Sequence, residues 1–113
     1  KIYGKIHCDI ANSYNNIGTL SENEGKYNDA MKCFQKCLQI REQIYGDEYH
    51  ETADSYFDIG RVLLVLNNLK GALAYFFKAA LIRKKVLGKD HPKTKTVKNL
   101  ISEISFKINL INV

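Results

Sequence analysis

Three cysteines are the first residues of this sequence whose types and spacing suggest chemistry. Cys33 and Cys37 lie four positions apart, so that a helix would place both thiols on one side, within reach of one metal ion. No histidine or second cysteine pair completes a four-ligand set, and Cys37 is better explained as a small packed side chain. The odd number of cysteines, with Cys8, favours a reducing compartment. We therefore expect no metal site and a cytoplasmic protein.

Histidines and carboxylates do not form a catalytic constellation. His7 and His91 recur at equivalent places in an internal repeat described below, and His50 lies near the same corner, which indicates a structural role. The sequence contains no glycine-rich phosphate loop, no nucleophile elbow and no carboxylate pair in a setting that would shift pKa values. We expect no catalytic residue, no cofactor and no enzyme activity.

The whole chain has a net charge of +5, and its second half contains one dense basic stretch. It consists of Arg83, Lys84, Lys85, Lys89, Lys93, Lys95 and Lys98. Such a stretch is suited to the phosphates of nucleic acid or to an anionic lipid surface. Aromatic residues that would stack on bases are not interleaved with it, and cations are ordinarily favourable at a helix C-terminus. Binding of nucleic acid or lipid is therefore the alternative interpretation, and no apolar run approaches the roughly 20 residues of a transmembrane segment.

The elements that must position these residues follow from an internal repeat. A shift of 42 positions aligns residues 1–42 with residues 43–84, and thirteen of the aligned pairs are identical. Among them are Gly18 with Gly60 and Phe34 with Phe76. A fixed period of this size is typical of stacked repeats, in which no unit buries its apolar face alone.

Apolar residues within each repeat have helical spacing. A first stripe passes through Ala11, Tyr14, Ile17 and Gly18, and a second passes through Ala30, Phe34, Cys37 and Leu38. We call the two predicted helices helix A and helix B. Helix A should end near Gly25 in the first repeat and near Asn67 and Asn68 in the second, and helix B should end at Gly46 and Gly88. Gly18 and Gly60 would let helices A and B approach closely beside a phenylalanine ring.

These residues resemble a tetratricopeptide repeat. The resemblance rests on residues 11–18, Gly25-Lys26-Tyr27, Ala30, Phe34 and Cys37, and on Tyr56, Ile59, Gly60, Ala72, Phe76 and Ala79 in the second copy. The 42-residue spacing and the following Asp90-His91-Pro92 resemble the longer repeats of kinesin light chains. The resemblance implies an all-α fold of antiparallel helix pairs stacked in a right-handed superhelix, an α-solenoid. It also implies a scaffold for protein–protein interaction.

The predicted organisation is a single array over residues 1–113. Residues 1–6 are expected to end a preceding helix B, residues 7–46 to form the first repeat and residues 49–88 the second. Residues 91–113 are expected to form a C-terminal capping helix without a helix B. Because the opening Ile2-Tyr3-Gly4 recurs as Ile44-Tyr45-Gly46, we expect the chain to be a piece of a longer array.

The inner wall of such a superhelix is lined by helix A, so residues beside its packed stripe should face a groove. The expected groove residues are Asn12, Asn15, Asn16, Thr19, Phe57, Asp58, Arg61 and Asn99. Asparagine carries both a donor and an acceptor, which suits it to the amide groups of an extended peptide. The resemblance assigns Asn15, Asn16 and Asn99 to the family's groove asparagines, whereas Phe57 and Asp58 depart from that pattern. We predict a peptide or protein partner, with Phe57 as the apolar anchor.

Self-association is a further alternative, because the ends of a repeat stack expose apolar surface. Ile2, Tyr3 and Ile6 at one end would meet Ile108 and Ile111 at the other in a homodimer.

Overall fold

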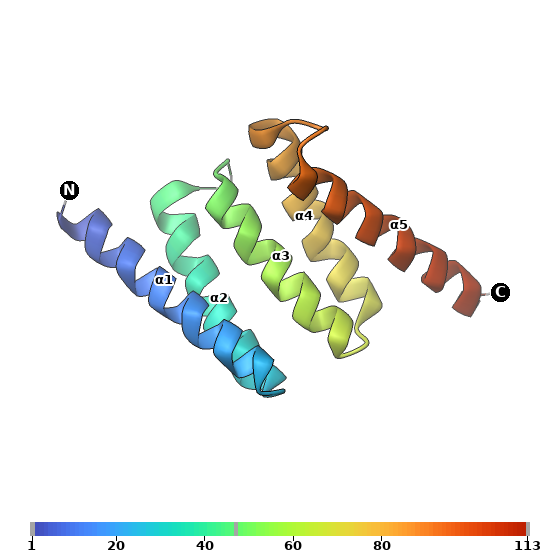
Figure 1. Cartoon of the computed structure of the whole chain (residues 1–113), viewed down its shortest axis with the longest axis horizontal. Helices are drawn as coiled ribbons and strands as arrows, with labels where there is room; N and C mark the ends of the chain where they lie inside the picture. Colours follow the sequence, from blue (N-terminus) through green and yellow to red (C-terminus); the bar gives the residue numbers. More distant parts are fainter. Residues whose placement is uncertain (1, 47, 113) are drawn as a thin grey trace.

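The computed structural model describes residues 2–46 and 48–112, and this part of the chain forms five α-helices (Figure 1). They are α1 (Ile2–Asn23), α2 (Tyr27–Tyr45), α3 (His50–Val65), α4 (Leu69–Leu87) and α5 (Pro92–Asn112). Consecutive helices are antiparallel and pack in chain order along a body of 53 × 33 × 19 Å, with the two termini at opposite ends of the long axis. The fold is an all-α repeat solenoid. No helix in the described part is long and apolar enough to cross a membrane.

Helix A ends in both repeats where the sequence supplies a residue that tolerates the left-handed conformation. Gly25, after α1, has a φ of 78°, and Asn67, after α3, has a φ of 63°. The Asn68 side chain then caps α4 by accepting a hydrogen bond from the Gly71 amide at 2.9 Å. The predicted ends of α1 and α3 are confirmed.

The predicted boundary after residues 1–6 is wrong for those of them that the structure describes. Residues 2–6 belong to α1, and Gly4 lies inside that helix rather than at a helix end. Its equivalent, Gly46, has a φ of 72° and ends α2. The difference follows from what comes next: Lys5 and Ile6 are compatible with a helix and continue α1.

Each helix pair closes on a contact between a glycine and a phenylalanine. An added Cβ on Gly18 would lie 2.7 Å from Cε1 of Phe34, and one on Gly60 would lie 2.7 Å from Cε1 of Phe76. Both rings are fully buried. The predicted close approach of helices A and B is therefore confirmed in both repeats.

The apolar stripe of helix A is buried to different extents in α1 and α3. Ile17 in α1 is 51% exposed, whereas its equivalent in α3, Ile59, is 1% exposed. α2 packs against α3 and covers this side of it. On α1 the same side forms an open hollow of about 430 Å³ along Ile6, Ile10 and Ile17. The predicted packed stripe is therefore complete in α3 and partial in α1.

Candidate functional site

Residues from all five helices line one hollow of about 320 Å³, which we call the groove hollow. Its lining consists of Asn15 from α1, Arg41 from α2, Asp54, Phe57, Asp58 and Arg61 from α3, Arg83 from α4 and Lys93 from α5. Four residues that the sequence assigned to a groove lie here together: Asn15, Phe57, Asp58 and Arg61. The site is polar and carries charges of both signs.

The other four predicted groove residues do not line this hollow. The side chains of Asn16 and Asn99 are exposed to solvent. Thr19 donates its hydroxyl hydrogen bond back to the Asn15 carbonyl at 2.9 Å. Asn12 is engaged by an arginine of α2, as described next.

Arg41 joins α1 and α3 from the C-terminal half of α2. It is 6% exposed, and its Nη1 donates to the Glu51 carbonyl at 3.1 Å and to Ser55 Oγ at 2.9 Å. Its Nη2 donates to Asn12 Oδ1 at 3.3 Å. Helices from two consecutive repeats are therefore bonded to one buried guanidinium.

Arg83 makes the equivalent bonds one repeat later. Its Nη1 donates to the Lys93 carbonyl at 3.1 Å and its Nη2 donates to Asp54 Oδ1 at 3.2 Å, which joins α3, α4 and α5. These partners lie 42 positions after Glu51 and Asn12. Sequence reasoning placed Arg83 in an exposed basic patch, and this is wrong because the side chain is 4% exposed. The signal that identifies its role is its identity with Arg41 across the repeat.

The remaining basic residues of the stretch do not share one environment. Lys85 forms an ion pair with Glu48, and Lys93 Nζ lies 3.6 Å from Asp54 Oδ1. The others are exposed and have no ion pair among the described residues: Lys84, Lys89, Lys95 and Lys98. The stretch is thus divided between structural pairs and solvated lysines.

Arg61 ties α3 to α1 at the edge of the groove hollow. Its Nε donates to Glu22 Oε2 at 2.8 Å and its Nη2 donates to Glu22 Oε1 at 2.7 Å, a bidentate arrangement. Its Nη1 donates to Asp58 Oδ1 at 3.0 Å. Hydrogen bonding to Glu22 is the main cause that raises the pKa of Arg61, so the guanidinium remains charged.

Burial raises the pKa of Asp58 above its ordinary value of 3.8, against the opposing effect of Arg61, while nearby Asp54 adds to the rise. The folded state therefore binds this proton more tightly than the unfolded state. Asp58 contributes stability below its ordinary pKa, and that contribution is lost as the pH rises through its raised folded pKa.

We expect a carboxyl titration followed by carbon NMR to give an Asp58 midpoint above 3.8. The midpoint should rise further in Arg61→Met, because a favourable cation is removed, and fall in Asp54→Asn, because a neighbouring anion is removed. A midpoint for Asp58 at or below 3.8 would contradict the burial effect.

Phe57 lies half-buried in the floor of the groove hollow. Its ring centroid is 5.3 Å from that of Phe76, and the Arg83 guanidinium carbon lies 4.5 Å from the Phe57 centroid. Part of the ring therefore supports Arg83, and the remainder lines the hollow.

Several buried polar atoms around the groove hollow have no hydrogen-bond partner in the described part of the chain. They are Asn15 Oδ1, Arg41 Nε and Arg83 Nε. A buried polar group left unpaired costs about 1–3 kcal/mol.

The cysteines lie outside this site. Cys37 is buried with its Sγ 3.6 Å from Ser55 Oγ, and burial raises its pKa, so that it remains a packed thiol. Cys8 Sγ lies 2.8 Å from the Tyr45 hydroxyl. Within residues 2–46 and 48–112, no cluster of three or more histidine, cysteine or carboxylate side chains has the geometry to hold a metal ion.

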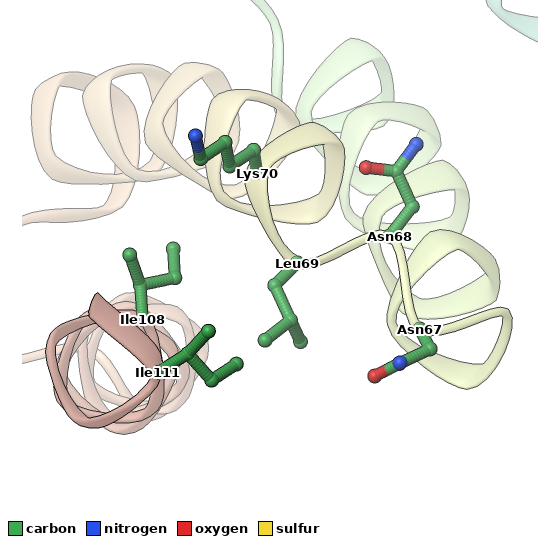
Figure 2. A pocket seen from close by; sticks show the side chains of 6 residues that line it. All are labelled: Asn67, Asn68, Leu69, Lys70, Ile108 and Ile111. Atoms are coloured by element: carbon green, nitrogen blue, oxygen red, sulfur yellow. The ribbon is translucent and has the colours of Figure 1, made fainter. Parts of the chain in front are cut away.

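Another hollow, of about 240 Å³, lies between the start of α4 and the end of α5. Figure 2 shows Leu69, Ile108 and Ile111 around it, with Lys70 on the adjoining turn of α4. Asn67 and Asn68 complete its lining. We call it the α4–α5 hollow. It has an apolar centre and no converging charged groups of the kind found in the groove hollow.

Comparison with known proteins agrees with this architecture. The sequence model of the tetratricopeptide repeat family matches residues 9–79, which extend from within α1 into α4. A search of curated proteins finds no match. The family match spans more than half of the chain and includes both contacts between a glycine and a phenylalanine. The chain therefore belongs to the tetratricopeptide repeat family.

Proposed function

We propose that this chain is a non-catalytic scaffold that binds a peptide or a helix of a partner protein in the groove hollow. Tetratricopeptide repeats are generally protein–protein interaction modules. The 42-residue period supports assignment to the kinesin-light-chain-like repeats, and the three free cysteines support a cytoplasmic setting. Phe57, Asp58 and Arg61 are the proposed contacts from α3, and Asn15 is the proposed contact from α1.

The observation that carries this proposal is the convergence of all five helices on one polar hollow that is lined by charges of both signs. Asn15 lines the hollow, and its side-chain amide carries both a donor and an acceptor for the backbone groups of a partner. Arg61, which also lines the hollow, is held by two hydrogen bonds to Glu22, so this part of the hollow is ordered before the partner arrives. Binding then requires little ordering of the scaffold, which favours affinity.

The test is selection of peptides from a displayed random library, followed by calorimetric titration of the selected peptides. Asn15→Ala should weaken their binding about tenfold, because a buried hydrogen bond to the partner is lost. Asn16→Ala is the matched control: the neighbouring asparagine is exposed and lies outside the groove hollow, so its removal should leave the affinity unchanged. Equal losses in the two variants would contradict the placement of the site in the groove hollow.

A further inference from the structure

The face of α4 that points away from the core carries apolar residues between lysines. Its exposed positions recur every three to four residues: Lys70, Ala74, Phe77, Leu81 and Lys85. Phe77 is 50% exposed and Leu81 is 71% exposed. We call this set of five residues the α4 stripe. Adjacent, solvent-exposed phenylalanine and leucine side chains of this kind favour contact with another molecule.

α2 provides an internal comparison for the α4 stripe. The five positions that precede it by 42 residues lie on the equivalent face of α2 and are also exposed. They are Asn28, Lys32, Gln35, Gln39 and Gln43. The fold therefore accepts polar residues on this face of a helix B. The fold therefore does not require the exposed apolar side chains of Phe77 and Leu81.

Continued stacking of repeats does not explain the α4 stripe either. α2 is followed by a complete second helix pair, α3 and α4, and yet Gln35 and Gln39 remain exposed. A further helix pair placed after α4 in the same manner would leave Phe77 and Leu81 exposed as well. The surface is therefore distinct both from the stacking surfaces and from the groove hollow.

Charge separates a second copy of this chain from a different partner. The exposed residues of α4 include four lysines, of which Lys85 pairs with Glu48, and no acidic residue, whereas those of α2 include two lysines and one aspartate. Lys70 lies at one end of the α4 stripe, and Lys84 and Lys85 lie at the other. Two copies joined through this face would oppose lysines to lysines in either relative direction, which disfavours the pairing. Acidic groups at both ends of the partner would complement the surface.

We propose that the α4 stripe binds an amphipathic helix of a partner protein, with its apolar side chains on Phe77 and Leu81 and acidic residues at both ends. The α4–α5 hollow shares Lys70 with the stripe and adjoins its N-terminal end. Leu69, Ile108 and Ile111 would receive an apolar side chain from the end of the bound helix (Figure 2). This inference does not depend on the groove hollow or its ligand.

The experiment uses a synthetic helical peptide with leucines at i, i+4, i+7 and i+11 and glutamates in its first and last turns. The whole chain is titrated with it by fluorescence anisotropy. Binding should weaken about tenfold or more in Phe77→Gln/Leu81→Gln, which installs the glutamines found at the equivalent positions of α2. A peptide with lysines in place of the glutamates should bind more weakly than the original to the wild type, and the preference should reverse in Lys70→Glu/Lys84→Glu.

Matched controls decide between the outcomes. Gln35→Ala/Gln39→Ala changes the same face of α2 and should leave the affinity unchanged. Unfolding curves of Phe77→Gln/Leu81→Gln should match the wild type, because the changed side chains are exposed. Equal affinity of the wild type and Phe77→Gln/Leu81→Gln would overturn the proposal. So would a wild-type dimer, detected by sedimentation equilibrium, that Phe77→Gln/Leu81→Gln converts to a monomer.

Discussion

Substitution of Gly60 by alanine is expected to lower the free energy of unfolding by about 2 kcal/mol. Alanine is the better helix former by about 1 kcal/mol, so local propensity alone predicts stabilisation. The added Cβ would lie 2.7 Å from Cε1 and 2.8 Å from Cδ1 of Phe76, whose ring is fully buried. Overpacking costs about 1–3 kcal/mol, and a Cβ this close to a buried ring should cost the upper end of that range. Subtracting the propensity gain of about 1 kcal/mol leaves the expected net loss of about 2 kcal/mol.

Urea unfolding of Gly60→Ala against Gly4→Ala gives the sharpest comparison. Gly4 also lies in a helix, but an added Cβ there meets nothing within 4 Å, so this variant should be neutral or slightly more stable. Gly60→Ala/Phe76→Leu should recover part of the loss, because the smaller side chain makes room for the methyl group. Equal midpoints for Gly60→Ala and the wild type would show that the helix pair opens without cost.

Substitution of Arg83 by methionine is expected to lower the free energy of unfolding by about 2–3 kcal/mol. It leaves the Lys93 carbonyl and the Asp54 carboxylate without their guanidinium partner, while methionine retains most of the buried apolar volume. The loss should be smaller than for a fully enclosed pair, because the Asp54 side chain is 31% exposed and Lys93 Nζ lies nearby.

Hydrogen exchange locates the effect of Arg83→Met. Because Arg83 bonds to the start of α5, amide protection should fall most in α5, and Arg41→Met should instead reduce protection in α1 and α3. Lys84→Met removes an exposed positive charge next to Arg83 and should change stability by less than about 0.5 kcal/mol. A uniform loss of protection in both arginine variants would contradict the assignment of each arginine to its own pair of repeats.

The candidate site was only partly predictable from the sequence. Helical geometry fixes the face on which a residue lies. This was enough to place four residues beside the packed stripe and near one another: Asn15, Phe57, Asp58 and Arg61. The same rule assigned Asn16 and Asn99 to the groove, although neither lines the groove hollow. Residues one position apart on a helix point about 100° apart, so their exposure depends on neighbouring helices that local spacing does not describe.

The assignment of Arg83 to the basic stretch was wrong for a related reason. In the sequence, Arg83 is indistinguishable in type from exposed Lys84, and proximity along the chain grouped them together. In the structure Arg83 is buried against Asp54 and the Lys93 carbonyl, whereas Lys84 is exposed. The recurrence of arginine at positions 41 and 83 is the feature of the sequence that indicates a structural role for both.

The ends of α1 and α3 at Gly25 and Asn67, and the close approach of each helix pair at Gly18 and Gly60, could be predicted from the sequence alone. These features depend on residue spacing, on backbone conformations and on side-chain size, which a 42-residue repeat displays directly. The packing of the helices sets which charges are paired, which stripe of α1 lies open and which apolar residues of α4 face solvent. Burial and pairing arise from contacts between residues distant in the chain, and local sequence does not specify those contacts.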